Sequence, residues 1–150
     1  RLLAATITAL FLTLLAVAGM ETSVTLHARD RFLFRQRDMA WFFLFMGVIV
    51  AVIQGGLIGR FAKTIGERKL IIIGSLSFTV AFLAVPSVWR VPLLYAVAFF
   101  IAIGQGLTYP SLTSLVSKAA PEDQRGSVLW LATSMGSLAR FLGPSVSGFL

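Results

Sequence analysis

Glu21 and Arg140 are the two charged side chains that fall inside long apolar runs of this 150-residue sequence. A charge at the centre of a membrane-spanning helix costs roughly 2.5–3.5 kcal/mol on insertion scales, so such residues are expected to pair or to face a polar cavity. At about 1.5 Å per helical residue, Glu21 would lie about 28 Å and Arg140 about 21 Å from the same membrane surface. We therefore expect the two side chains to share a polar cavity and to interact directly or through water, which would offset much of the burial cost.

Glu21 is the candidate proton carrier, because it is the one carboxylate inside an apolar run. Coupling to protons needs a group that alternates between a charged and a neutral state, and burial of a carboxylate favours that alternation. Two plainer interpretations remain open. Glu21 lies near the outer end of its run and would then simply face water, while Arg140 would have a structural role, such as capping backbone carbonyl groups.

A second group of polar side chains lies within the segment "GQGLTYPS" of a later apolar run. Gln105 and Tyr109 are four residues apart and so share one face of a helix. We predict both as contacts of a bound small molecule, together with Gln54 in an earlier run. Pro110 removes one helical hydrogen bond and is expected to kink the helix there. The alternative is that the small and hydroxyl-bearing residues of this segment only pack helices together.

The apolar runs that carry these residues predict an all-α membrane protein. Hydrophobic residues make up 57% and charged residues 13% of the chain, and the mean hydropathy is +0.89. Soluble domains usually have about 45–50% apolar and about 25% charged residues. A helix needs about 20 apolar residues to cross a bilayer, and a barrel would need alternating segments of about 10, which are absent. We predict five transmembrane helices in one domain spanning residues 1–150, at Leu2–Thr25, Trp41–Gly59, Leu70–Trp89, Val91–Val116 and Gly126–Leu150.

The charge pattern argues against several other functions. The net charge is +7, but the basic residues lie mostly between the apolar runs rather than on one face. The Arg- and Phe-rich segment "RDRFLFRQRD" is therefore expected at the membrane interface, where its amphipathic pattern suggests a short helix lying along the membrane. No nucleic acid is expected as a partner. Cysteine is absent, the single His27 has no ligand cluster around it, and "GERK" lacks the P-loop pattern. We expect no metal, no cofactor and no enzymatic activity.

A basic connector, "GGLIGRFAKTIGERKL" from Gly55 to Leu70, joins the second and third runs. If the connectors alternate sides, seven basic residues lie on the side of this connector and five on the other. The excess of Lys and Arg predicts a cytoplasmic position for it. Gly66 would allow a turn that a Cβ atom would penalise, and Arg60 would interact with the negative end of the preceding helix.

This connector resembles the loop signature of the major facilitator superfamily, through Gly56, Arg60, Gly66, Arg68 and Lys69. Gly59 stands where the signature usually has Asp, as is common in the copy found in the second half of such proteins. The segments "AVAGMETSVTLHARDRF" and "SLTSLVSKAAPEDQRGSVLW" also resemble those of multidrug and tetracycline-type exporters. The resemblance covers essentially the whole sequence.

The resemblance implies helices 7–11 of a twelve-helix fold, in a multi-pass protein of the cell (inner) membrane. The partners would be the lipid bilayer, the N-terminal half of the same polypeptide, a small lipophilic substrate and protons. The two halves of such a protein rock about a site near the bilayer midplane, and the signature loop would act as a gating latch or only anchor the topology. Two alternatives stay open: a non-transporting receptor or scaffold of the same fold, and uptake or uniport of a small solute.

Overall fold

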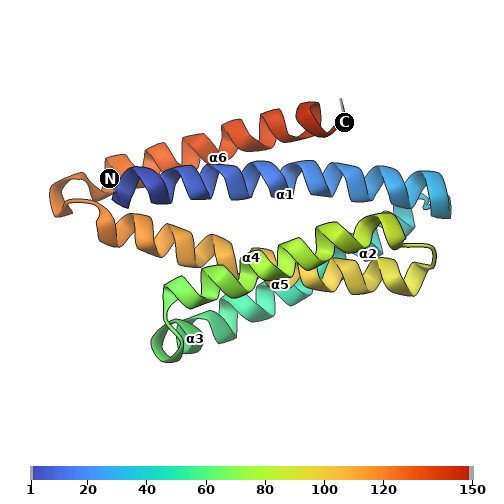
Figure 1. The fold of residues 1–150 in the computed structure, drawn as a ribbon, viewed down its shortest axis with the longest axis horizontal. Helices are drawn as coiled ribbons and strands as arrows, with labels where there is room; N and C mark the ends of the chain where they lie inside the picture. The colour runs from blue at the N-terminus through green and yellow to red at the C-terminus, as the bar shows by residue number, and fades with distance from the viewer. Residues whose placement is uncertain (1, 149–150) are drawn as a thin grey trace. The chain divides into compact units, whose positions relative to one another are not determined.

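The chain is helical along nearly all of its length (Figure 1). A computed structural model describes residues 2–148, with side chains for residues 3–145. No strand occurs among residues 2–148, which confirms the predicted all-α class. The elements are α1 (Leu2–Phe32), α2 (Gln36–Val52), η1 (Ile53–Leu57), α3 (Ile58–Thr64), α4 (Glu67–Ala84), η2 (Val85–Ser87), α5 (Val91–Ala119), η3 (Glu122–Gln124) and α6 (Arg125–Gly148).

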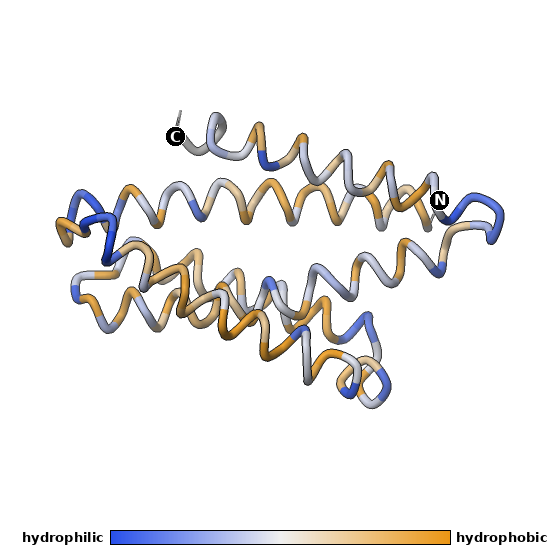
Figure 2. Tube along the Cα trace, turned by 180° about the vertical axis from the view of Figure 1, so that it is seen from behind, coloured by the Kyte–Doolittle hydropathy of each residue, from blue (hydrophilic) through white to orange (hydrophobic). Residues whose placement is uncertain are grey.

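Four helical stretches of the described residues are long and apolar enough to cross a membrane. Apolar residues dominate these stretches, and hydrophilic residues gather at the connectors (Figure 2). Helix α6 has 24 residues but is not among the four, because Ser, Thr, Gly and Arg140 dilute its apolar character. The fifth predicted span is therefore present as a helix, and its crossing of the membrane stays a prediction. The four stretches are Leu3–Phe32, Gln36–Thr64, Glu67–Ser87 and Val91–Ala119.

The first connector is much shorter than the sequence suggested. Helix α1 continues to Phe32 and α2 starts at Gln36, so the prediction of a separate helix along the membrane is wrong. Arg and Gln are good helix formers, and helical hydrogen bonding does not stop where apolar composition stops. Leu33 turns the chain with a φ of 53°, and the Asp38 carboxylate caps α2 by accepting a hydrogen bond from the Arg35 N–H at 2.9 Å.

The second predicted span is interrupted and also extended. Residues Ile53–Leu57 form a π-helical segment, and α3 then continues to Thr64 rather than ending at Gly59. Lys63, not Arg60, is consequently the cation in the last helical turn. Such π segments are rare insertions into α-helices and occur often at functional positions. The sequence signals this segment only through the pair Gly55–Gly56, at the start of the basic connector.

The chain divides into two compact units. The first holds residues up to Ser23 and those from Tyr109 onward, and the second holds Val24–Thr108. In the first unit, α6 lies alongside α1 (Figure 1). A Cβ atom added at Gly136 would lie 2.9 Å from Leu14 Cδ1, and one at Gly143 would lie 2.6 Å from Ala18 Cβ. Both contacts advance along the two helices together, so α1 and α6 run in the same direction.

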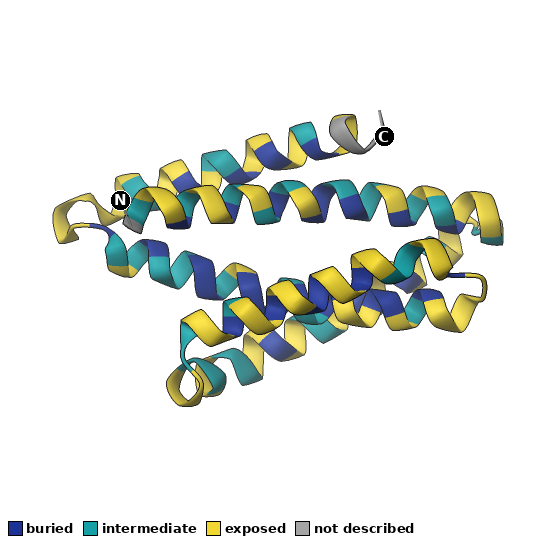
Figure 3. Cartoon of the chain, viewed as in Figure 1, coloured by how far each residue is buried: buried dark blue, intermediate teal, exposed yellow. Residues whose placement is uncertain are grey.

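In the second unit, α4 and α5 pack closely. A Cβ atom on Gly74 would overlap the Thr108 hydroxyl, and the Ser77 hydroxyl donates a 2.7 Å hydrogen bond to the Phe100 carbonyl. Buried residues line the facing sides of these helices, while their outer sides are exposed (Figure 3). Small residues and hydroxyl groups are the usual means of close helix packing in membranes. The α4–α5 pair is therefore the tightly packed centre of this unit.

Candidate functional site

The close packing of α1 and α6 brings the two charges of the apolar helices into one region. Glu21 follows Ala18 by three residues on α1, and Arg140 precedes Gly143 by three residues on α6. Because the two helices run in the same direction, Glu21 lies about one turn beyond the contact between Ala18 and Gly143, and Arg140 lies about one turn before it. The Arg140 guanidinium interacts electrostatically with the Glu21 carboxylate. Glu21 is half-buried, whereas Arg140 is exposed in this chain.

The hydroxyl groups of the two residues that follow Glu21 donate hydrogen bonds to backbone carbonyl groups of α1. Thr22 donates a 3.0 Å hydrogen bond to the Ala18 carbonyl, and Ser23 donates one of 3.1 Å to the Gly19 carbonyl. Such bonds satisfy hydroxyl groups within an apolar helix. What distinguishes Glu21 is its ionisable group, which can take up or release a proton beside a fixed positive charge. This pairing was predicted from sequence depth alone, and the structure places the two residues on neighbouring helices of one unit.

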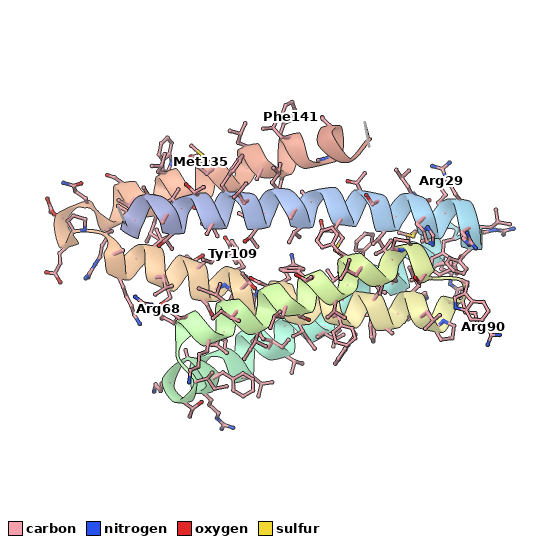
Figure 4. All side chains as sticks on the ribbon, viewed as in Figure 1. Arg29, Arg68, Arg90, Tyr109, Met135 and Phe141 are labelled. Carbon is pink, nitrogen blue, oxygen red and sulfur yellow. The ribbon has the colours of Figure 1, made fainter. Side chains whose placement is uncertain are left out.

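The polar segment of α5 lies in an unbroken helix. Val91–Ala119 runs through Pro110 as one 29-residue helix, and the kink expected at Pro110 stays a prediction. Gln105 is half-buried, and Tyr109, labelled in Figure 4, is 36% exposed. Their spacing of one turn along α5 fits the prediction that they share a face.

Two hydroxyl groups of α5 are buried without a partner. Thr108 Oγ1 and Ser111 Oγ are inaccessible and make no hydrogen bond within the part of the chain that the structure describes. An unpaired buried hydroxyl costs about 1–3 kcal/mol relative to a satisfied one. Their burial assigns Thr108 and Ser111 to helix packing rather than to an accessible surface.

Gln54 lies on the exposed side of the π-helical segment. A π turn holds an extra residue relative to an α turn and so re-aims the side chains that follow. Gln54 and Gln105 belong to the second unit, whereas Tyr109 belongs to the first, together with Glu21 and Arg140. The residues predicted to contact a small molecule are thus divided between the two units.

The basic connector forms the turn that the sequence predicted. Gly66 has a φ of +88° and precedes α4, which confirms that this position needs a conformation that L side chains rarely adopt. The Ile65 and Gly66 N–H groups donate to the Phe61 carbonyl at 2.8 and 3.3 Å, closing the end of α3. Of the signature residues, Gly56 lies in η1, Arg60 on α3, and Arg68 and Lys69 in the first turn of α4.

The arginines at the ends of the second unit lie on two sides. Figure 4 shows Arg68 at the opposite end of this unit from Arg29 and Arg90. This agrees with connectors that alternate sides of a membrane. At the Arg90 end, the guanidinium stacks on the Trp89 ring at 4.6 Å, and His27 Nε2 lies 3.2 Å from the Val88 carbonyl oxygen. His27 is on α1 rather than in a loop, and it ties the end of that helix to the turn between α4 and α5.

Potential metal ligands do not cluster in the part of the chain that the structure describes. Among the residues searched, which are those the structure describes, no group of three or more His, Asp or Glu side chains could hold a metal ion. The predicted site residues offer a carboxylate and a guanidinium on α1 and α6, and amide and phenol groups on η1 and α5.

These features together define the class of protein. Long apolar helices, a Gly- and Arg-rich connector after the second of them, and ionisable groups inside them are typical of secondary transporters. The family model described as Major Facilitator Superfamily matches residues 1–144. The chain belongs to the major facilitator superfamily.

Individual relatives agree with this membership. The chain is 29% identical over 140 residues to the human Hippocampus abundant transcript 1 protein, covering 93% of the chain and 28% of the relative. It is 28% identical over 137 residues to Major facilitator superfamily domain-containing protein 10 of Mus musculus, covering 91% of the chain and 30% of the relative. It is 30% identical over 125 residues to Tetracycline resistance protein, class E of Escherichia coli, covering 79% of the chain and 31% of the relative.

The chain spans less than a third of the length of these curated relatives. No solved structure matches it.

Proposed function

We propose that the protein moves a small molecule across a cell membrane by alternating access, as a proton-coupled exporter. The observation that carries the proposal is the charged pair of the first unit, a half-buried Glu21 in an apolar helix with Arg140 interacting with it from α6. A carboxylate in such a place can bind a proton in one transporter state and release it in another, because burial favours the neutral form, the guanidinium favours the ionised form, and a conformational change alters the balance. Membership of the superfamily supports transport itself.

Export of a lipophilic compound is the form of transport that we favour. One relative is named as a tetracycline resistance protein. In this proposal Gln105 and Tyr109 of α5, with Gln54 of η1, contact the substrate through hydrogen bonds from an otherwise apolar cavity. The loop residues Gly56, Arg60, Gly66, Arg68 and Lys69 hold one state closed from the cytoplasmic side. The remainder of the substrate cavity comes from an N-terminal half of the same polypeptide.

The test is transport by the complete protein in everted membrane vesicles, with and without an imposed proton gradient. A lipophilic cation and tetracycline serve as probes. Glu21→Gln should remove the acceleration by the gradient while leaving exchange of labelled for unlabelled substrate, since exchange needs no net proton movement. Glu122→Gln is the matched control, because Glu122 is exposed and only pairs with Arg125 at 3.3 Å.

Arg140→Gln and Arg140→Lys separate the charge of Arg140 from its shape. Arg140→Lys should retain part of the response of transport to the proton gradient. Arg140→Gln should lose this response, as Glu21→Gln does. Gradient-driven transport by Glu21→Gln at the wild-type rate would remove Glu21 as the carrier. Transport that ignores the gradient in the wild-type protein would remove proton coupling altogether.

A further inference from the structure

An apolar groove lies on the second unit, between the α2–η1–α3 stretch and α5. Its volume is about 420 Å³. Ile53 and Leu107, both buried, form its floor and belong to one packed cluster with Leu70. Its walls are exposed: Val48, Val52 and Phe99 have 54%, 57% and 44% of their surface accessible. The groove is thus a supported hollow in a helical surface, and every side chain that lines it is apolar.

The groove is somewhat longer than one leaflet of the hydrocarbon core of a bilayer. Val48 lies near one end and Phe61 near the other, a separation of 13 residues, or about 20 Å along a helix. One leaflet of the hydrocarbon core is about 15 Å deep, half of the usual thickness of about 30 Å. The groove therefore reaches from the edge of the core to beyond its middle, which is the extent of one acyl chain.

The two ends of the groove differ in charge. Near Val48 the helices stay apolar, whereas Phe61 lies between Arg60 and Lys63 on α3, and both cations are exposed. Arg60 follows the groove residue Leu57 by three positions and so lies on the same side of the helix. Arginine and lysine are the side chains that bind phosphate groups. A ligand with an apolar tail and an anionic head matches this polarity.

We propose that the groove binds an acyl chain of an anionic phospholipid, with its phosphate held at Arg60 and Lys63. The chain lies on Ile53 and Leu107 between the walls formed by Val52 and Phe99. The headgroup then sits at the connector that carries the basic residues, so occupancy of the groove stabilises the helical end of α3. This site is distinct from the charged pair on α1 and α6 and does not depend on the direction or coupling of transport.

Photocrosslinking tests the acyl-chain part of the proposal. The complete purified protein is placed in phosphatidylcholine vesicles that contain phosphatidylglycerol with a diazirine in its acyl chain, and labelled peptides are mapped by mass spectrometry. We expect label on the groove peptides of α2 and α5. Val52→Trp fills the groove and should lower this labelling at least several-fold. Val80→Trp is the matched control, because Val80 is similarly exposed (49%) on α4, outside the groove.

The headgroup part is tested by comparing phosphatidylglycerol with phosphatidylcholine that carries the same diazirine. The wild-type protein should prefer phosphatidylglycerol at the groove. The double variant Arg60→Gln/Lys63→Gln should lower that preference by up to about 30-fold, at about 1 kcal/mol for each basic residue and a factor of ten per 1.4 kcal/mol. Arg29→Gln, at the other end of the unit, should retain it. These surface variants keep the proposal testable even where Val52→Trp does not fold.

Four results would overturn the proposal. Equal labelling of Val52→Trp and Val80→Trp would mean that the label does not enter the groove. If the groove peptides of the wild-type protein take up no label from the diazirine lipid, a protein helix fills the groove instead of an acyl chain. Equal labelling by the two lipids, or a preference that survives the double variant, would mean that Arg60 and Lys63 do not hold the phosphate.

Discussion

Substitution of Gly74 by alanine tests the close packing of α4 on α5. The added Cβ would overlap Thr108 Oγ1 and would lie 3.1 Å from the Gly104 carbonyl oxygen and 3.2 Å from the Thr108 nitrogen. The hydroxyl can rotate away, but the two backbone atoms move only if the helices separate. Overpacking of this kind costs typically about 1–3 kcal/mol.

The control for this substitution is Gly47→Ala on α2, where an added Cβ would meet nothing within 4 Å. Alanine favours a helix over glycine by about 0.5–1 kcal/mol at either position, so this gain cancels in the comparison. We expect Gly74→Ala to have an unfolding free energy about 1–3 kcal/mol below that of Gly47→Ala. Reversible unfolding of the purified protein in a titration with a denaturing detergent measures both values.

A double variant shows whether Thr108 is the group that the new Cβ meets. Thr108→Ala alone should cost little, because Thr108 Oγ1 has no hydrogen-bond partner among the described residues. In combination with Gly74→Ala it should recover part of the loss, which gives a coupling free energy within the range of about 0.5–3 kcal/mol for residues in contact. Equal stability of Gly74→Ala and Gly47→Ala, or strictly additive effects, would refute the packing argument.

Two further substitutions test single features of the second unit. Ser77→Ala removes the 2.7 Å hydrogen bond to the Phe100 carbonyl and should lower the unfolding free energy by about 0.5–1.5 kcal/mol. Ser75→Ala, at an exposed position of α4, is the control and should not lower it. Similar losses from both substitutions would contradict the role of that bond. Gly66→Ala places a Cβ at a φ of +88° and should cost about 1–3 kcal/mol, measured by the same titration. Gly126→Ala, where φ is ordinary and the space is open, is its control, and an equal effect of the two would show that backbone conformation is not the cause.

The candidate charged pair shows what depth along a helix predicts and what it does not. Counting residues from the helix ends put Glu21 and Arg140 within reach of each other in depth, because helical rise is nearly constant. Only packing could place their two helices side by side. The residues that do so are Gly136 and Gly143, whose missing side chains let α6 approach α1, and nothing in the local sequence states which helix a glycine faces.

The ends of the helices and the groove on the second unit could not be predicted from apolar composition. Apolar composition marks the part of a helix that lies in lipid, but α1 continues through Arg29, Asp30 and Arg31 to Phe32 because the helical backbone remains favourable outside lipid. The π segment shifts the side chains after Ile53 around the helix. That shift contributes to a groove whose floor and walls come from residues about 50 positions apart along the chain.

By itself, the sequence determined the all-α class, the order of the helices and the turn at Gly66, because runs of apolar residues and a glycine with positive φ are local properties. The resemblance in the basic connector also pointed to the superfamily that the family match then established. The tertiary structure decided which helices pack together, which hydroxyl groups of α5 are buried and where an apolar groove opens. These depend on contacts between residues distant in the chain, where one missing methyl group at Gly74 or Gly143 decides how closely two helices approach.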